Sequence, residues 1–180
     1  AELSLKSGDK EAAAEYYMDI LEVDSLNIFA LTNLTDYYRE KEDYSNSFKF
    51  LAKSFSSPQI EVSRKLAILS FYLSDEGHVH TYSSEIGDVM EVLATTHPEV
   101  SDIRLLATDF YIQVQEYSEA YKHLREYLEL QKGSYNIHMQ AIMLANAASL
   151  NEELLYSSDK ALELFPDSAD IRFFRGIGLY

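Results

Sequence analysis

The stretch RLLATDFYIQVQEYSEAYKHLREYLEL (Arg104–Leu130) decides the fold class of this chain. Its apolar and small residues recur at spacings of three and four, which place them on one face of a helix and not of a strand. The pattern predicts two helices, over 101–114 and 117–131, joined by a short turn.

The same pattern recurs along the chain with a period of about 34 residues, a length typical of helical repeats. Pro98 and Pro166 are separated by two such periods, whereas Pro58 and Pro98 are separated by one period and six further residues. The aligned first-helix columns are Arg64, Arg104 and Arg172; Ala67, Ala107 and Arg175; and Phe71, Tyr111 and Leu179. The second-helix column is Ala13, Ser47, Ile86, Ala120 and Leu154. Such a period indicates helical pairs that stack and bury their apolar faces against their neighbours.

This arrangement resembles the tetratricopeptide repeat, a helix–turn–helix unit of about 34 residues. A large and a small residue followed by an aromatic mark its first helix, and an alanine and a closing proline mark its second. The tryptophan of the family's first helix is missing, because the chain contains no tryptophan. The resemblance implies an all-α fold, a right-handed α–α superhelix (solenoid) of antiparallel helix hairpins.

We expect a single solenoid over residues 1–180. Its parts are a half unit (1–27), four units (28–60, 61–100, 101–134 and 135–168) and a second half unit (169–180). Because both ends fall inside a unit, we expect a fragment of a longer repeat chain. The unit 61–100 is six residues too long, and the extra residues lie around DEGHVHTYSS (Asp75–Ser84). A longer turn or an extended start of the second helix would absorb this insertion around His78 and Tyr82, either as a neutral surface loop or as a binding feature.

Composition excludes several classes of function. The chain has 15 basic and 30 acidic residues, a net charge of -15, which argues against nucleic-acid partners and anionic membrane surfaces. No apolar run reaches the roughly 18 residues of a membrane span, so we expect no direct membrane insertion. The absence of cysteine excludes disulfides, zinc–thiolate sites and cysteine nucleophiles, and it favours an exported or periplasmic location over a cytoplasmic one.

No motif in the sequence indicates catalysis. His78 and His80 would point to one side of an extended segment, but a lone His-x-His pair has low specificity for metal. The carboxylates recur at helical spacing on what should be solvated faces, without the cleft that proton transfer requires. We therefore expect no enzyme activity, no catalytic residues, no cofactor and no metal.

The resemblance places a binding surface on the concave side, which the first helices line. Ten residues represent this predicted groove: Phe29, Asn33, Asp36, Lys65, Leu69, Leu105, Asp109, Met139, Met143 and Phe173. The lysine, asparagine and arginine pattern with which some family members clamp a carboxylate does not repeat from unit to unit, and the face is instead rich in leucine, methionine and phenylalanine. Such a groove suits a peptide or an amphipathic helix of a partner protein. We expect a non-catalytic protein-interaction scaffold, and the alternative is a helical scaffold region of a larger enzyme or sensor.

Overall fold

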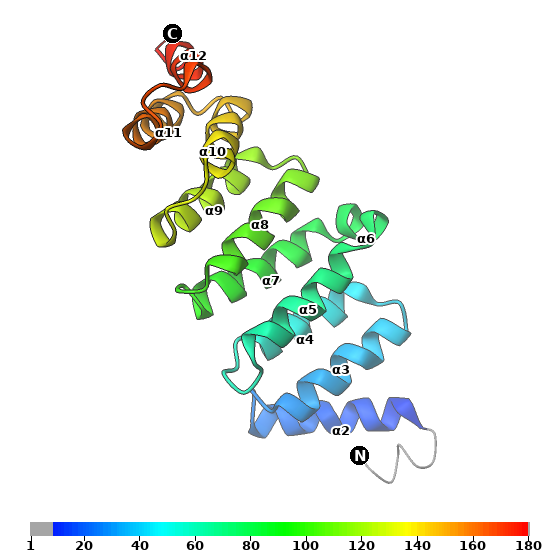
Figure 1. The fold of residues 1–180 in the computed structure, drawn as a ribbon. Coiled ribbons are helices and arrows are strands. Elements are labelled where there is room, and N and C mark those ends of the chain that lie inside the picture. The colour runs from blue at the N-terminus through cyan, green and yellow to red at the C-terminus, as the bar shows by residue number, and fades with distance from the viewer. Residues whose placement is uncertain (1–8, 180) are drawn as a thin grey trace. The chain divides into compact units, whose positions relative to one another are not determined.

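The computed structural model describes residues 9–179, and these residues form helices and turns without a strand. The chain divides into two compact units, one ending at Pro98 and the other beginning at Glu99 (Figure 1). The all-α prediction is therefore confirmed for the described part of the chain. None of its helices is long and apolar enough to cross a membrane.

The first unit contains six helices among the described residues. They are α2 (Lys10–Val23), α3 (Ile28–Glu40), α4 (Tyr44–Phe55), α5 (Val62–Leu73), α6 (Glu76–Thr81) and α7 (Ser83–Thr96). Helix α3 packs against both α2 and α4, and α4 packs against α7. The predicted insertion therefore forms a short helix of its own, α6, rather than a longer turn.

The second unit contains five helices among the described residues. They are α8 (Ser101–Gln113), α9 (Tyr117–Leu130), α10 (Tyr135–Ala147), α11 (Asn151–Leu164) and α12 (Ala169–Ile177). The pairs α8–α9 and α10–α11 are helix hairpins, α9 also packs against α10, and α11 packs against α12. These hairpins are the helix–turn–helix units that the repeat period predicts.

Three of the hairpin turns share one backbone geometry. Glu42, Gln115 and Ser149 have positive φ angles of 58°, 63° and 56°, and each lies two residues before the second helix of its hairpin. In each turn the next residue donates its N–H to a carbonyl five residues back, as Glu116 does to Tyr111 over 2.8 Å. This left-handed C-terminal cap satisfies carbonyls that the helix end leaves unpaired and reverses the chain. The α5–α7 pair lacks such a turn and has α6 in its place.

Side-chain caps fix several helix starts. Asp9, Asn27, Asp43 and Ser168 each accept a hydrogen bond from a backbone N–H in the first turn of α2, α3, α4 and α12. Each such cap is typically worth about 1 kcal/mol, because it satisfies one of the free donors at the helix start.

Each unit buries its own apolar cluster. In the first unit, Leu31 and Leu34 of α3 pack with Tyr17 of α2 and Phe50 of α4. In the second, the buried members of the cluster include Ala120, Leu124, Ala141, Ile142, Ala145, Leu154, Ala161 and Ile171. Ala120 is fully buried, as its place in the second-helix column of the repeat predicts.

One column of the first helices contains a charged residue. The column consists of Leu31, Lys65, Ile103, Ile137 and Ile171, which follow one another by one repeat period, with four extra residues between Lys65 and Ile103. Leu31, Ile103 and Ile171 are fully buried, and so is Lys65. The chain thus buries an ammonium group where the other repeats place an aliphatic side chain.

Candidate functional site

A groove opens between α3 and α5 in the first unit, with α4 as its floor. Its volume is about 420 Å³. The lining residues are Ile28, Phe29, Thr32, Thr35, Asp36 and Arg39 of α3, Leu51, Ser54 and Phe55 of α4, and Ile60, Arg64, Ile68 and Tyr72 on or just before α5. The groove exists because α3 and α5, the first helices of two consecutive repeats, are not closely packed against each other, whereas α3 packs closely against α4.

The apolar part of the groove includes an exposed aromatic side chain, Phe29. Phe29 is 57% exposed, and its ring meets the Tyr17 ring edge to face at 5.6 Å between centroids. Phe55 and Leu51 are buried in the floor. An exposed phenylalanine beside a buried apolar floor is the arrangement of a site for an apolar side chain.

The charged part of the groove is basic. Arg39 and Arg64 line it together with a single carboxylate, Asp36, and both arginines are exposed. The Arg39 Nη2 atom lies 2.7 Å from the Asp36 Oδ1 atom. Two cations against one anion give the groove a net positive charge in a chain whose net charge is -15.

Two of the predicted residues, Phe29 and Asp36, line this groove. Asn33 is half-buried, and its side-chain amide donates to the Phe29 carbonyl oxygen over 2.7 Å. It lines a smaller hollow between α2 and α3 instead. Phe29 and Asp36 thus lie at a hollow beside α3, whereas the Asn33 amide is bonded to the backbone of its own helix, and binding at this surface stays a prediction.

The prediction that Lys65 and Leu69 line an open groove is wrong. Lys65 and Leu69 are both fully buried, so neither is available to a partner in an open groove. The sequence pattern aligned the residues after Pro58 with those after Pro98, so it placed α8 one repeat period and six residues after α5. The buried residues of α5 and α8 instead correspond at one repeat period and four residues. An error of two residues turns a helix by about 200°, which exchanges the buried and the exposed face.

The same error misplaced the aromatic column. Phe71, which the repeat alignment places in one column with Tyr111, is 69% exposed. The buried aromatic of α5 is Tyr72, whose ring lies 4.9 Å from that of Phe48. The missed groove residues on α5 include Arg64 and Ile68. One strict repeat period counted from α3 would have found the register, because it aligns Leu31 with Lys65 and Leu34 with Ile68.

The predicted residues of the second unit lie partly on its surface. Met143 and Phe173 are 55% and 66% exposed on α10 and α12. Leu105 and Met139 are half-buried against the apolar cluster of the unit, and Asp109 is exposed. Whether any of these five side chains binds a partner stays a prediction.

The buried Lys65 is held by backbone groups. Its Nζ atom donates to the Phe55 oxygen over 2.6 Å and to the Ser57 oxygen over 2.8 Å, and it lies 2.9 Å from the His97 Nε2 atom. Burial lowers the pKa of the Lys65 ammonium group. Phe55 and Ile60 line the groove, so the segment between them forms one end of it. The hydrogen bonds of Lys65 to Phe55 and Ser57 hold this segment in place.

His78 and His80 do not lie in an extended segment, the geometry in which both side chains would point to one side. His78 and His80 belong to helix α6, so side chains two residues apart point to different sides. The His78 Nδ1 atom lies 3.2 Å from an Asp75 carboxylate oxygen, and its ring packs on the Tyr44 ring at 4.4 Å between centroids. His80 is exposed. The insertion is therefore anchored on α4 through His78.

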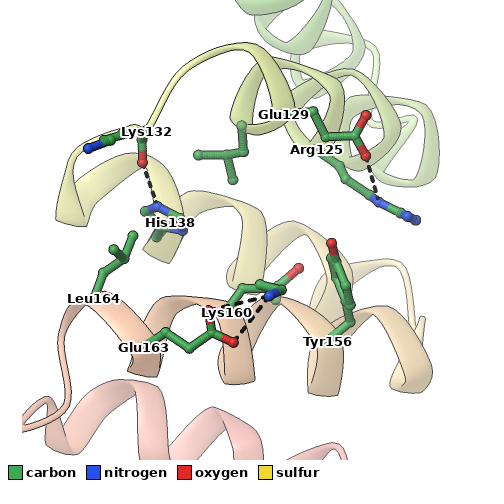
Figure 2. A pocket seen from close by; sticks show the side chains of 10 residues that line it. Arg125, Glu129, Lys132, His138, Tyr156, Lys160, Glu163 and Leu164 are labelled. Atoms are coloured by element: carbon green, nitrogen blue, oxygen red, sulfur yellow. Dashed lines mark hydrogen bonds and ion pairs between the residues drawn. The ribbon is translucent and has the colours of Figure 1, made fainter.

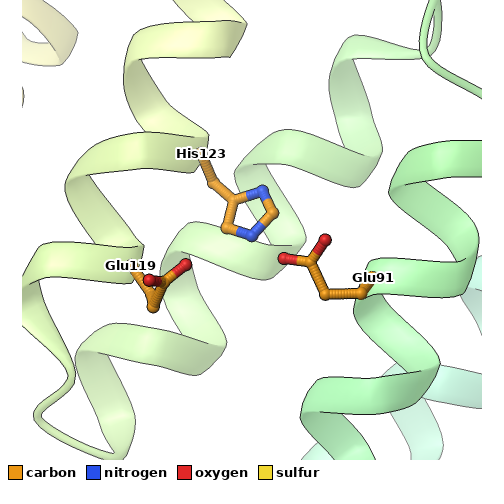
Figure 3. A group of neighbouring side chains, drawn as sticks. All are labelled: Glu91, Glu119 and His123. Carbon is orange, nitrogen blue, oxygen red and sulfur yellow. The ribbon is translucent and has the colours of Figure 1, made fainter.

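Another histidine was not singled out from the sequence. Figure 3 shows Glu119 and His123 projecting from the same side of α9, one turn apart. His123 is buried and stacks on the Tyr111 ring of α8, with 5.3 Å between centroids and 9° between planes. The His123 ring thus serves the packing of the α8–α9 hairpin.

Comparisons with models of protein families and with curated proteins gave no match. Solved structures gave matches of low identity. A crystal structure of MamA shares 16% identity over 89% of this chain and 91% of that chain, with a TM-score of 0.40. TTC0263, a tetratricopeptide repeat protein of Thermus thermophilus, shares 17% identity over 98% of this chain and 94% of its own, with a TM-score of 0.38. A tetratricopeptide repeat protein from Parabacteroides merdae shares 17% identity over 97% and 68% of the two chains, with a TM-score of 0.37. The repeat architecture of this chain rests on its own hairpins and their shared turns.

Proposed function

We propose that this chain is a non-catalytic protein-interaction module that binds a segment of a partner protein in the groove between α3 and α5. The observation that carries the proposal is the combination of a hollow of about 420 Å³, an exposed Phe29 and a net positive lining in an acidic chain. Stacked helical hairpins commonly present extended surfaces of this kind to other proteins.

The chemistry of the groove selects the kind of segment. Its apolar floor favours an apolar or aromatic side chain of the partner, and buried aromatic anchors often supply much of the binding energy at protein interfaces. Arg64 has no ion pair with the described residues, whereas Arg39 is paired with Asp36. We infer that the segment bears an acidic residue beside its apolar anchor, so that its carboxylate meets Arg64.

Binding suits this groove better than catalysis. Its one carboxylate, Asp36, is exposed and paired with Arg39 at 2.7 Å. Proton-transferring carboxylates are usually held in desolvated clefts that shift their pKa. The net charge of -15 also favours a protein partner over a nucleic acid.

A random-peptide phage library selected on the immobilised full chain tests the proposal. We expect the enriched peptides to combine an acidic residue with apolar neighbours. In isothermal titration, Phe29→Ser and Arg64→Gln should each weaken a selected peptide about tenfold, which corresponds to loss of a typical anchor contact.

Phe71→Ser is the matched control, because Phe71 is a still more exposed phenylalanine that lies on α5 outside the groove. The Phe71→Ser chain should bind the selected peptide with the same affinity as the parent chain. Peptides whose affinity falls with Phe71→Ser and not with Phe29→Ser or Arg64→Gln would place the interaction elsewhere and refute the proposal.

A further inference from the structure

Helix α5 is packed less closely against the helix before it than three other first helices are. Helices α3, α10 and α12 each pack closely against the preceding second helix, which is α2, α9 or α11. Helix α5 does not pack closely against α4. In the repeat column described above, α3, α10 and α12 carry Leu31, Ile137 and Ile171, whereas α5 carries Lys65. The helix that stands apart is therefore the one with a lysine in this column.

The Lys65 side chain reaches the C-terminal end of α4. Its Nζ atom donates to the oxygen of Phe55, the last residue of α4, over 2.6 Å, and to the oxygen of Ser57 over 2.8 Å. The last carbonyl groups of a helix lack partners within the helix, and the helix dipole favours a cation at this end. The ammonium group is thus held at the end of α4, and the length of the lysine side chain separates it from the backbone of α5.

The second unit makes an equivalent bond with a shorter side chain. Figure 2 shows His138 of α10, whose Nε2–H donates to the Lys132 backbone oxygen over 2.9 Å. Lys132 lies two residues after the end of α9, as Ser57 does after the end of α4. The connection to the next helix covers 131–134 here and 56–61 in the first unit, so it is two residues shorter here. With the shorter side chain and the shorter connection, α10 packs closely against α9.

We propose that the Lys65 ammonium group opens the groove between α3 and α5 by holding α5 away from α4. The space that remains lies over Leu51 and Phe55, the buried residues of the groove floor. Arg64, the neighbour of Lys65 on α5, lines the same space. Lys65 is fully buried and reaches no partner itself, so it is a positioning residue. Its effect on binding rests on the function proposed above.

The spacing of α4 and α5 can be measured without a partner. The chain has no cysteine, so two spin labels can be attached at Lys53→Cys on α4 and Ser63→Cys on α5, both exposed positions. Double electron–electron resonance then gives the distance between the labels. We expect Lys65→Leu to shorten this distance by about 1–2 Å, the spread of interaxial distances among packed helices. An unchanged distance would overturn the proposal.

The effect on binding is measured with the peptide selected for the groove. Lys65→Leu should weaken this peptide about tenfold, a loss comparable to that of one anchor contact. Lys49→Leu is the matched control, because Lys49 is an exposed lysine of α4 that does not line the groove, and it should leave the affinity unchanged.

A chemical rescue separates the ammonium group from the bulk of the side chain. Lys65→Cys is alkylated in urea and refolded. Bromoethylamine gives a side chain of lysine length that ends in an ammonium group, and propyl iodide gives one of the same length that ends in a methyl group. We expect bromoethylamine to restore the parent affinity and propyl iodide to leave it weakened.

Two binding results would also refute the proposal: equal affinity of the two alkylated chains, or a shortened label distance with unchanged affinity. If no peptide is selected, or if Phe29→Ser leaves the selected peptide unaffected, the proposed function fails instead, and the label distance still tests the role of Lys65. Circular dichroism checks that each variant folds. If Lys65→Leu does not fold, Lys65→Met takes its place in both measurements.

Discussion

The Lys65 side chain donates a hydrogen bond of 2.6 Å to the backbone oxygen of Phe55, ten residues before it in the sequence. A second bond to Ser57 and the contact with His97 use the remaining two donors of the ammonium group. A fully buried lysine is rare unless its donors are satisfied, and here all three are.

Lys65→Met tests whether this lysine stabilises the fold. The column of Leu31, Ile103 and Ile171 suggests that an apolar side chain fits the space. However, the substitution leaves the Phe55 and Ser57 oxygens without their donor, and an unsatisfied buried polar group costs about 1–3 kcal/mol. We expect this loss in the free energy of unfolding, measured by urea denaturation. The control is Lys53→Met, at an exposed lysine of α4, which should change stability little. A more stable Lys65→Met chain would show that desolvation of the charge dominates.

Alkaline pH should raise the contribution of Lys65 to stability. Burial lowers the pKa of this lysine in the folded state, so between the folded and the unfolded pKa the unfolded chain binds more protons. The free energy of unfolding therefore rises with pH across that window, and below the folded pKa the contribution of Lys65 is constant. The difference in stability between the parent chain and Lys65→Met, followed from neutral pH to the ordinary lysine pKa, should grow in favour of the parent. A difference that stays flat would contradict the lowered pKa.

Ala120→Leu tests the close packing of the α8–α9 hairpin. Ala120 is fully buried, and three added carbon atoms would overpack its surroundings. We expect a loss of about 1–3 kcal/mol in thermal or urea unfolding. Ala147→Leu, at an exposed alanine of α10, is the control. If both variants unfold like the parent chain, the hairpin has room that the structure does not show.

Gly133→Ala and Gly176→Ala should change stability in opposite directions. Gly133 has a left-handed φ and a Cβ there would lie 2.5 Å from Leu128, so alanine should destabilise the chain by at least about 1 kcal/mol. Gly176 lies inside α12 with open space around its Cβ position, and alanine is favoured over glycine in a helix by about 1 kcal/mol. Melting temperatures of the two variants provide the measurement. A stabilised Gly133→Ala chain would show that the turn does not need this conformation.

The sequence by itself determined the helices and their repeat. The spacings of three and four predicted helices over 101–114 and 117–131, whose limits agree with those of α8 and α9 within one residue, and the repeat period predicted the pairing of helices. Prediction of the helices succeeds because the spacing of apolar residues and the residues that begin and end a helix are local properties of the chain. The shared hairpin turns were not predicted, because Glu42, Gln115 and Ser149 take a conformation that glycine usually signals.

The sequence offers two registers for α5, one from a strict repeat period counted from α3 and one from the spacing of Pro58 and Pro98, and only the tertiary structure decided between them. Pro58 and Pro98 suggested one register, but the helix adopts the one that buries Lys65, Leu69 and Tyr72 and exposes Phe71. The physical reason is that a helix turns by about 100° per residue, so a small uncertainty in loop length reverses its faces. The packing of α5, together with the hydrogen bonds of Lys65 to Phe55 and Ser57, selects one face. The same packing brings Arg64 and Ile68 into the groove with Phe29, a juxtaposition between separate helices that no local sequence pattern contains.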